Sequence, residues 1–373
     1  MKANPGQRRV SVSGPPDWPS APKPVRLIRL GFEARARPDT VMVMDPIPPV
    51  AVIMPVLNEE RHLAEAVAAI TAQDYQGDLQ IALALGPSTD STDRVAAQLQ
   101  AADPRIILVP NPAGKTPAGL NAALAATTHP IVVRVDGHAL LPPDYVRTAV
   151  EVLERTGADN VGGVMAAVGS TDFERAVACA MRSRLGVGAA SFHTGGQEGP
   201  ALTVYLGAFR RAALERVGGY DEAYVRAQDW EMNHRIRETG GQVWFTPAME
   251  VTYRPRSTVR ALAKQYLHYG RWRREIMRQH PETVSLRYLA PPMAVTGLVT
   301  SVSAAVIGGL SGRRKAWVAW LPSAVYTGAV VVGGLLISPD EPARVRMRVP
   351  VALATMHMSW GVGFLTSPAN LRS

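Results

Sequence analysis

The sequence predicts an α/β fold with a mostly parallel sheet, followed by apolar helices at the C-terminal end. Two observations lead to this prediction. Short apolar runs alternate with helical patterns between residues 50 and 155, and three long stretches without Asp, Glu, Lys or Arg follow residue 287. Apolar strands that alternate with helices are typical of a parallel sheet whose faces are covered by helical crossovers.

Four pairs of a strand and a helix follow one another along the chain. The first pair is an apolar run at residues 50–56 and a helix with Leu63, Val67 and Ile70 on one face. The others are strands at residues 81–85, 106–109 and 131–135, followed by helices at residues 93–100, 117–126 and 143–155. Polar residues follow the first, second and fourth strands, and parallel sheets bind ligands at the carboxyl ends of their strands. We therefore expect the functional site at this edge of the sheet.

The first 49 residues differ from the rest because they are rich in Pro, Arg and Ser. They contain no apolar run as long as the core of a signal peptide, so we expect the N-terminus to stay in the cytoplasm. Residues 1–49 are predicted to form a disordered tail, with contact to lipid as the alternative.

The C-terminal region predicts a membrane anchor. The uncharged stretches span residues 288–310, 316–337 and 349–371, and roughly 20 apolar residues cross a bilayer. Pro291 and Pro292 are expected to bend the first stretch, which could instead be a re-entrant or interfacial element. Buried helices of a soluble protein are the alternative, and two to three spanning helices are compatible with the sequence.

The charge distribution points to the same end of the chain. Residues 50–249 carry 16 Lys and Arg against 22 Asp and Glu, whereas residues 250–373 carry 16 against 5. The basic end is also the apolar end, which favours a membrane surface and not nucleic acid as the partner. Residues 254–287 hold nine Lys and Arg and two Glu, so this basic amphipathic segment is predicted to flank the membrane on its cytoplasmic side. The single cysteine, Cys179, excludes a disulfide-stapled module.

Carboxylates at loop positions are the candidates for chemistry. Asp136 ends the fourth strand, and His138 two residues later points to the same side of an extended chain, so both side chains could hold one divalent ion. Asp229 and Glu231 open an amphipathic helix at residues 230–239. The alternatives are a turn or helix cap at Asp136, a helix N-cap at Asp229, and a simple interfacial helix at the basic residues 265–274.

These motifs, in this order, resemble those of family 2 glycosyltransferases with a GT-A fold, over about residues 50–290. The nucleotide-binding turns of that family resemble Pro55-Val-Leu-Asn58-Glu59 and Ser88-Thr-Asp-Ser-Thr92. The family's Asp-x-Asp metal motif corresponds to Asp136-Gly-His138, and its acidic base motif corresponds to Gln228-Asp229-Trp-Glu231. Its Gln-x-x-Arg-Trp motif corresponds to His268-Tyr-Gly-Arg271-Trp272. Residues 206–211, 218–222 and 270–274 are similar to succinoglycan-type exopolysaccharide β-glucosyltransferases with C-terminal membrane helices.

The resemblance implies a role for each matched residue. Asp229 would be the catalytic base, with Glu231 tuning it. Asp136 and His138 would hold a divalent metal, Mn²⁺ or Mg²⁺. The donor would be bound by the residues of the matching motifs together with one nearby lysine, namely Pro55, Asn58, Glu59, Asp90, Lys115, Asp136, Arg271 and Trp272. Among the basic residues, Lys115, Arg271 and Arg273 are the candidates for the positive charges that contact the phosphates.

The resemblance also implies an activity. The expected enzyme is a multi-pass protein of the cytoplasmic membrane. Its catalytic domain would span residues 50–253 on the cytoplasmic side. A juxtamembrane segment at 254–287 would complete the active site, and a membrane region would follow at 288–373. It would transfer a hexose, with inversion, from a nucleotide-diphospho-sugar such as a UDP-sugar to a lipid-linked saccharide during exopolysaccharide or cell-envelope glycan synthesis. Transfer to polyprenyl phosphate and a non-catalytic scaffold of a polysaccharide assembly complex are the alternatives.

The sequence departs from the family pattern at two places. Leu85 and Gly86 stand where the family often has two Asp, one of which contacts the base of a uridine nucleotide. His138 replaces the second Asp of the metal motif, and an imidazole ligand shifts the preference from Mg²⁺ toward Mn²⁺.

Overall fold

The structure is a computed structural model that describes residues 46–188 and 190–372. The chain divides into two units, Met1–Pro46 and Ile47–Ser373, and the second unit is described below. Most of the tail predicted at residues 1–49 lies outside the described residues.

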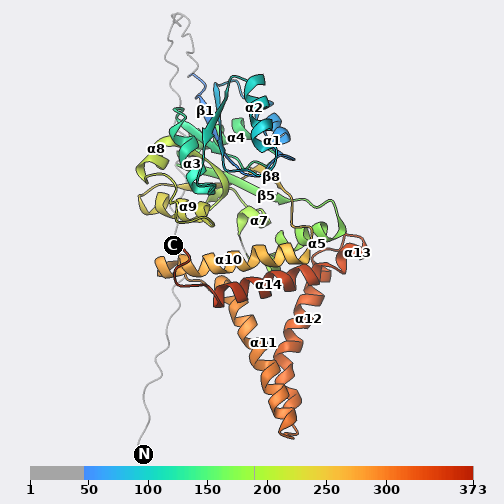
Figure 1. The fold of residues 1–373 in the computed structure, drawn as a ribbon. Coiled ribbons are helices and arrows are strands. Elements are labelled where there is room, and N and C mark those ends of the chain that lie inside the picture. The colour runs from blue at the N-terminus through green and yellow to red at the C-terminus, as the bar shows by residue number, and fades with distance from the viewer. Residues whose placement is uncertain (1–45, 189, 373) are drawn as a thin grey trace, which may run out of the picture. The chain divides into compact units, whose positions relative to one another are not determined.

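A mixed sheet of eight strands forms the centre of this unit (Figure 1). The strands are β1 (Val50–Val56), β2 (Leu79–Leu85), β3 (Ile106–Pro110), β4 (Ile131–Arg134), β5 (Asn160–Ala167), β6 (Gly199–Pro200), β7 (Tyr205–Arg210) and β8 (Val243–Tyr253), in the order β3-β2-β1-β4-β7-β5-β8-β6. The first four pair in parallel, and β5 pairs in parallel with β8. Antiparallel pairing joins β7 to β4 and β5, and β6 to β8. The predicted α/β fold with a mostly parallel sheet is therefore confirmed.

Helices pack on both faces of the sheet because strand side chains alternate between two cores. Val52 and Met54 of β1 belong to one apolar cluster with Leu63 of α1, while Ile53 between them joins another with Leu120 of α3. The helices of this part are α1 (Leu63–Thr71), α2 (Thr92–Ala102), α3 (Thr116–Ala125), α4 (Tyr145–Thr156), α5 (Asp172–Met181), α6 (Arg184–Val187), α7 (Ser191–Thr194), α8 (Arg211–Arg216) and α9 (Gln228–Glu238).

Two long helices lie side by side below the sheet, α10 (Val259–Gln279) and α14 (Val349–Leu365) (Figure 1). Their backbones touch because glycines face the contact. A Cβ on Gly270 would meet the backbone of Trp360, and a Cβ on Gly363 would meet the backbone of Leu267. A side chain at either glycine would push the two helices apart.

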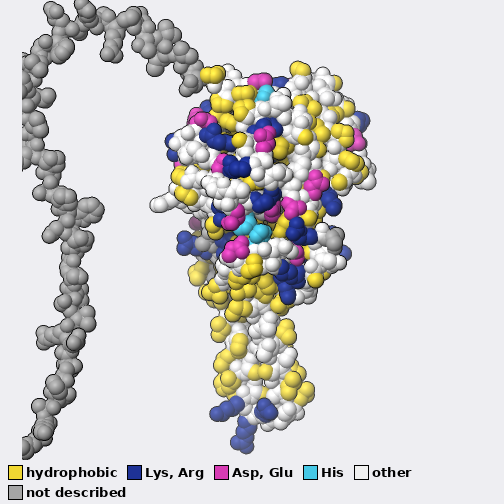
Figure 2. Space-filling model, turned by 90° about the vertical axis from the view of Figure 1, so that its left-hand side faces the viewer, with side chains coloured by type: hydrophobic (Ala, Val, Ile, Leu, Met, Phe, Trp, Pro, Cys, Tyr) yellow, Lys and Arg dark blue, Asp and Glu magenta, His cyan; other side chains and the backbone are white. Residues whose placement is uncertain are grey.

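A helical hairpin of α11 (Leu286–Leu310), η2 (Ala316–Trp320) and α12 (Leu321–Leu336) extends away from α10 and α14 (Figure 1). Its surface is apolar and exposed, as at Leu310, which is 86% exposed. Figure 2 shows hydrophobic side chains along the hairpin and Lys and Arg at its tip, where Arg313, Arg314 and Lys315 are exposed. The segments Leu286–Leu310 and Ala316–Leu336 are long and apolar enough to cross a bilayer.

The structure treats the three predicted membrane stretches differently. α11 runs as one continuous helix through Pro291 and Pro292. The stretch predicted at residues 349–371 forms α14, which packs against α10, α5 and the hairpin and buries Leu353 and Met356. Two short helical turns, η1 (Pro281–Thr283) and α13 (Ala343–Arg346), connect these longer helices to their neighbours.

Candidate active site

A cavity of about 960 Å³ lies at the carboxyl ends of β1 and β4 and continues to α10, α11 and α14. Its walls include Asp136 after β4, Asp229 in the first turn of α9, and Arg273 of α10. The site predicted at the carboxyl edge of the sheet therefore opens toward the helices that carry the apolar hairpin.

One buried arginine joins the two candidate carboxylates. Arg134, the last residue of β4, has a side chain only 3% exposed. Its Nη2 donates to Asp136 Oδ1 at 3.0 Å, and its Nη1 forms an ion pair with Asp229 Oδ1. Burial is the largest single influence on the pKa of Arg134 and acts to lower it, but the charge and hydrogen bond of Asp136 together with Tyr220 and Tyr205 raise the pKa on balance, so the guanidinium stays charged. We call Arg134, Asp136 and Asp229 the acidic end of the cavity.

The backbone before α9 places Asp229 at this point. α9 begins at Gln228, and the preceding residue, Ala227, lies in the left-handed region with φ of 60°. An alanine in this conformation costs roughly 1–2 kcal/mol relative to a relaxed backbone. The turn directs the first residues of the helix into the cavity, where Ala227, Gln228, Asp229 and Trp230 line the wall.

Glu231, predicted to tune Asp229, points elsewhere. Its side chain is 5% exposed and forms a two-pronged ion pair with Arg235, with Nε–Oε1 at 2.5 Å and Nη2–Oε2 at 2.7 Å. Glu231 is not among the residues that line the cavity. The pair instead fixes the middle of α9, because residues four apart share one face of a helix.

His138 is held by a second carboxylate. Its Nδ1 lies 2.7 Å from Glu59 Oε1, and both residues line the cavity with Asp136. The hydrogen bond to Glu59 raises the pKa of His138, and the negative charges of Asp136 and Glu59 act in the same direction against the effect of burial.

These residues are chemically suited to a divalent cation. Asp136 and Glu59 offer carboxylate oxygens and His138 an imidazole nitrogen on one wall of the cavity, a donor set compatible with Mn²⁺ or Mg²⁺. Asp136 keeps its second oxygen, Oδ2, free of Arg134. Asp136, His138 and Glu59 thus line the same cavity, and His138 contacts Glu59 directly.

The serine- and threonine-rich motif after β2 supports this wall from behind. Asn58 donates its backbone N–H to Ser88 Oγ at 3.1 Å and accepts from the Thr89 N–H at 2.8 Å. The Asp90 carboxylate accepts the Thr92 hydroxyl at 2.5 Å, and that hydroxyl accepts the Glu59 N–H at 2.8 Å. Neither Asn58 nor Asp90 lines the cavity, so the motif positions Glu59 through the loop.

The predicted donor-binding residues of α10 and the α3 loop separate into two groups. Trp272 lines the cavity with Gln265 and Arg273, whereas Arg271 and Lys115 do not. Trp272 is 3% exposed and packs against Tyr224 with ring centroids 5.9 Å apart, so it forms a wall of the cavity. Pro55 lines the cavity at the end of β1.

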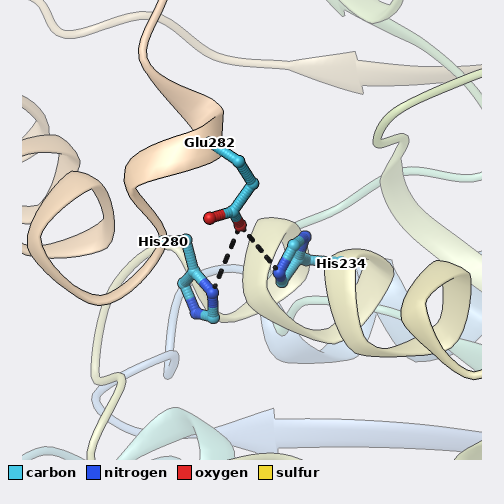
Figure 3. Close-up of side chains that lie close together, drawn as sticks. All are labelled: His234, His280 and Glu282. Carbon is cyan, nitrogen blue, oxygen red and sulfur yellow. Dashed lines mark ion pairs between the residues drawn. The ribbon is translucent and has the colours of Figure 1, made fainter.

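Three further metal-type ligands approach one another where α9 meets the segment after α10 (Figure 3). Glu282 Oε1 lies 3.5 Å from His234 Nε2 and 3.6 Å from His280 Nδ1. However, Arg237 Nη2 lies 3.4 Å from His234 Nδ1, the nitrogen that carries the proton when Nε2 binds a metal. The trio lies outside the cavity lining and links α9 to the segment that leads into α11.

Sequence reasoning gave no role to Arg134, Arg287 or Tyr288, which all line the cavity. Arg134 carried a signal, since a charged residue inside an apolar strand is rarely buried without a partner. Arg287 and Tyr288 carried none that distinguishes them from a basic and aromatic membrane flank.

Comparisons with known proteins agree with the fold and identify the family. The model of the family described as "Glycosyltransferase like family 2" matches residues 48–274. The succinoglycan biosynthesis protein ExoA of Rhizobium meliloti is 30% identical over 84% of this chain and 93% of its own length. A dolichyl N-acetyl-α-D-glucosaminyl phosphate 3-β-D-2,3-diacetamido-2,3-dideoxy-β-D-glucuronosyltransferase of Methanococcus voltae is 24% identical over 59% of this chain and 71% of its own.

Among solved structures, the mannosyltransferase PcManGT from Pyrobaculum calidifontis, in complex with GDP-Man and Mn²⁺, matches with a TM-score of 0.54. It covers 84% of this chain and 88% of its own and is 20% identical, so the likeness concerns the fold. The sheet with its cavity at the strand ends defines a glycosyltransferase of the GT-A fold. Within that class, the chain belongs to the family 2 glycosyltransferases.

Proposed function

We propose that this glycosyltransferase is anchored in the membrane and transfers a hexose from a nucleotide-diphospho-sugar to a lipid-linked saccharide in the synthesis of an exopolysaccharide or cell-envelope glycan. The observation that carries the proposal is the cavity, which connects Asp136 and Asp229 with Pro291 and Ala294 of the apolar helix α11 and Trp360 of α14. An acceptor with a saccharide and a lipid part would fit such a lining.

Two relatives support the acceptor class and the pathway. The similarity to ExoA, a succinoglycan biosynthesis protein, extends over almost the whole of that protein. The relative from Methanococcus voltae has a name that describes transfer to a sugar already attached to dolichyl phosphate. Both favour extension of a lipid-linked saccharide over transfer to the bare lipid phosphate.

Asp229 is the proposed catalytic base. Its carboxylate takes the proton of the acceptor hydroxyl while the hydroxyl oxygen bonds to the anomeric carbon. The bond from that carbon to the diphosphate oxygen breaks, its electron pair leaves with the nucleotide diphosphate, and the anomeric carbon inverts. Arg134 holds Asp229 in place through the ion pair between them. A base that is ionised and within hydrogen-bond reach supplies roughly 10²–10⁴-fold of rate.

Asp136, His138 and Glu59 would hold the divalent metal, which supplies positive charge to stabilise the diphosphate as it leaves. The mannosyltransferase of similar fold was solved with GDP-Man and Mn²⁺. Pro55 and Trp272 would shape the donor pocket beside this group.

The hairpin of α11, η2 and α12 is the proposed anchor. It would cross the cytoplasmic membrane twice, with α10 and α14 at the interface and the sheet on the cytoplasmic side, where the basic segment 254–287 favours it. Integral insertion predicts that the protein stays in the membrane pellet after high-salt and carbonate washes. Recovery in the soluble fraction would reject the anchor.

A donor screen on membranes that contain the protein tests the function. Radiolabelled nucleotide hexoses are offered, and both nucleotide diphosphate release and label in the lipid extract are measured. We expect one donor to label a lipid that already carries sugar, and the Asp229→Asn variant to lose the label. Label in a lipid with a single sugar would indicate the polyprenyl-phosphate alternative, and label only in water-soluble products would reject a lipid-linked acceptor.

A further inference from the structure

A second charged group lines the cavity far along the chain from Asp136, at the junction of α10 and α11. The guanidinium carbon of Arg273 lies 3.8 Å from the ring centroid of Tyr288, and that of Arg287 lies 4.6 Å from the same centroid. Arg287 Nη2 also donates to the Tyr288 hydroxyl at 2.5 Å. We call Arg273, Arg287 and Tyr288 the basic end of the cavity.

The positive charge of the basic end has no carboxylate partner among the residues that the structure describes. Neither Arg273 nor Arg287 forms an ion pair in this part of the chain, and Arg273 Nη1 is buried without a hydrogen-bond partner. Burial lowers the pKa of Arg273 to about 10, because the charged guanidinium is poorly solvated at this position. Buried charges are normally paired, so the buried and partnerless Nη1 of Arg273 indicates a missing anion. Arg287 is exposed and adds a second positive charge to the same cavity lining.

The neighbouring His193 carries no charge at neutral pH, so it does not change the net positive charge of the basic end. Burial, helped by the positive charge of Arg287, lowers the pKa of His193 to about 4, so its imidazole is neutral. His193 lines the same cavity. The net charge of the basic end is therefore available to a ligand.

The surroundings of the basic end indicate which anion it takes. The guanidinium carbon of Arg273 lies 4.9 Å from the ring centroid of Trp230. Trp230 directly follows Asp229 in the chain, so the basic end lies next to the proposed base. On its other side the cavity is lined by Pro291 and Ala294 of α11 and by Met356 of α14. A ligand that fits this sequence of contacts has a polar group, then a phosphate, then an apolar chain.

We propose that Arg273 and Arg287 bind the phosphate or diphosphate that joins the lipid and the saccharide of the acceptor. This inference rests on the proposed function, because it assigns the acceptor of that reaction to one end of the cavity. Guanidinium groups suit phosphate, since two parallel N–H groups donate to two oxygens. The phosphate would supply the counter-charge that the protein lacks, and the first turn of α11 would hold it at the membrane surface.

The same chemistry is present in the diphosphate of the donor, so the experiment separates the two sources. Full-length protein in neutral detergent is titrated with farnesyl diphosphate, with farnesol as the probe that lacks phosphate, and with UDP in the presence of Mn²⁺. The variants are Arg273→Gln and Arg287→Gln. The matched control is Arg260→Gln, which removes an exposed basic residue of the same helix that does not line the cavity.

We expect each cavity variant to weaken farnesyl diphosphate binding roughly 10-fold or more, because each removes charge-assisted hydrogen bonds to the phosphate. Binding of farnesol and of UDP, and all binding by Arg260→Gln, should stay within about twofold of wild type. The thermal unfolding temperature of Arg273→Gln should be no lower than that of wild type, because the substitution removes a buried unpaired charge. This result would separate lost binding from lost folding.

Three results would overturn the inference. Farnesyl diphosphate affinities that match wild type in both variants would remove the phosphate site. An equal loss for UDP would assign the arginines to the donor, and equal affinity of wild type for farnesyl diphosphate and farnesol would show that no phosphate is recognised. The proposed function fails separately, if the donor screen labels only water-soluble products, whatever these binding constants are.

Discussion

The acidic and the basic ends of the cavity differ in whether their charged side chains have partners of opposite charge within the chain. At the acidic end, Arg134 faces both Asp136 and Asp229, so each charge has a partner within the chain. At the basic end, Arg273 and the exposed Arg287 both contact the ring of Tyr288, Arg273 also stacks on Trp230, and neither has a carboxylate partner among the described residues. A paired charge can hold a side chain in place without a ligand. An unpaired buried charge lowers the stability of the fold, and a bound ligand of opposite charge can supply the missing partner. The contrast predicts that the two ends respond differently to the loss of an arginine.

The largest effect is expected from Asp229→Asn at the acidic end. The amide cannot accept the acceptor proton, so turnover should fall by roughly 10²–10⁴-fold while donor binding stays nearly unchanged. Initial rates of nucleotide diphosphate release at saturating donor and acceptor measure this. If the variant retains more than about a tenth of wild-type turnover, Asp229 is not the base.

Arg134→Met should lower stability, unlike Arg273→Gln. The substitution leaves two carboxylates facing each other without a counter-charge, which costs on the order of 3 kcal/mol. Arg134→Lys keeps the positive charge and should restore part of the stability. Thermal unfolding in detergent compares the three proteins. A wild-type unfolding temperature for Arg134→Met would contradict the contrast between the two ends.

Asp136→Ala tests the metal. We expect this variant to bind the donor roughly 10-fold more weakly in the presence of Mn²⁺ and to lose most of the difference between Mn²⁺ and chelator. Titration of a UDP-sugar with and without EDTA gives both values. Donor affinity equal to wild type under both conditions would remove Asp136 from the metal site.

A smaller effect is expected for His193 beside the basic end. Its folded pKa of about 4 lies below the unfolded value near 6.5, so the unfolded chain binds more protons between these values. This contribution to stability is present above pH 6.5 and is lost as the pH falls toward 4. His193→Gln should flatten the dependence, by about 2 kcal/mol at pH 5. Identical slopes of unfolding temperature against pH for both proteins would reject the assignment.

The sequence predicted the first half of the sheet better than the second. β1 to β4 are continuous apolar runs with a helix after each, so their pattern is local. β7 pairs antiparallel between β4 and β5, and β5 shifts its register on β8 between Gly162 and Val164. Such pairing depends on contacts between distant segments, which no short pattern shows.

The sequence predicted site residues whose role follows from their position at the end of a strand or helix. It did not predict residues whose role depends on contacts with distant segments. Asp136 and Asp229 lie at the ends of elements and line the cavity as expected. The bridging role of Arg134 needs β4 and α9 to meet, which the sequence does not display. Of the two predicted arginines of α10, Arg273 lines the cavity and Arg271 does not. Helix periodicity could have separated them, because residues 265, 269, 272, 273 and 276 share one face of a helix and all line the cavity.

The central claim is that one cavity receives the donor at its acidic end and the acceptor phosphate at its basic end. Steady-state kinetics with both substrates varied, on wild type, Asp136→Ala and Arg273→Gln, tests this claim most directly. The account predicts that Asp136→Ala raises KM for the donor alone and that Arg273→Gln raises KM for the lipid-linked acceptor alone. If either variant raises both KM values to the same extent, the two ends do not serve separate substrates and the claim is wrong.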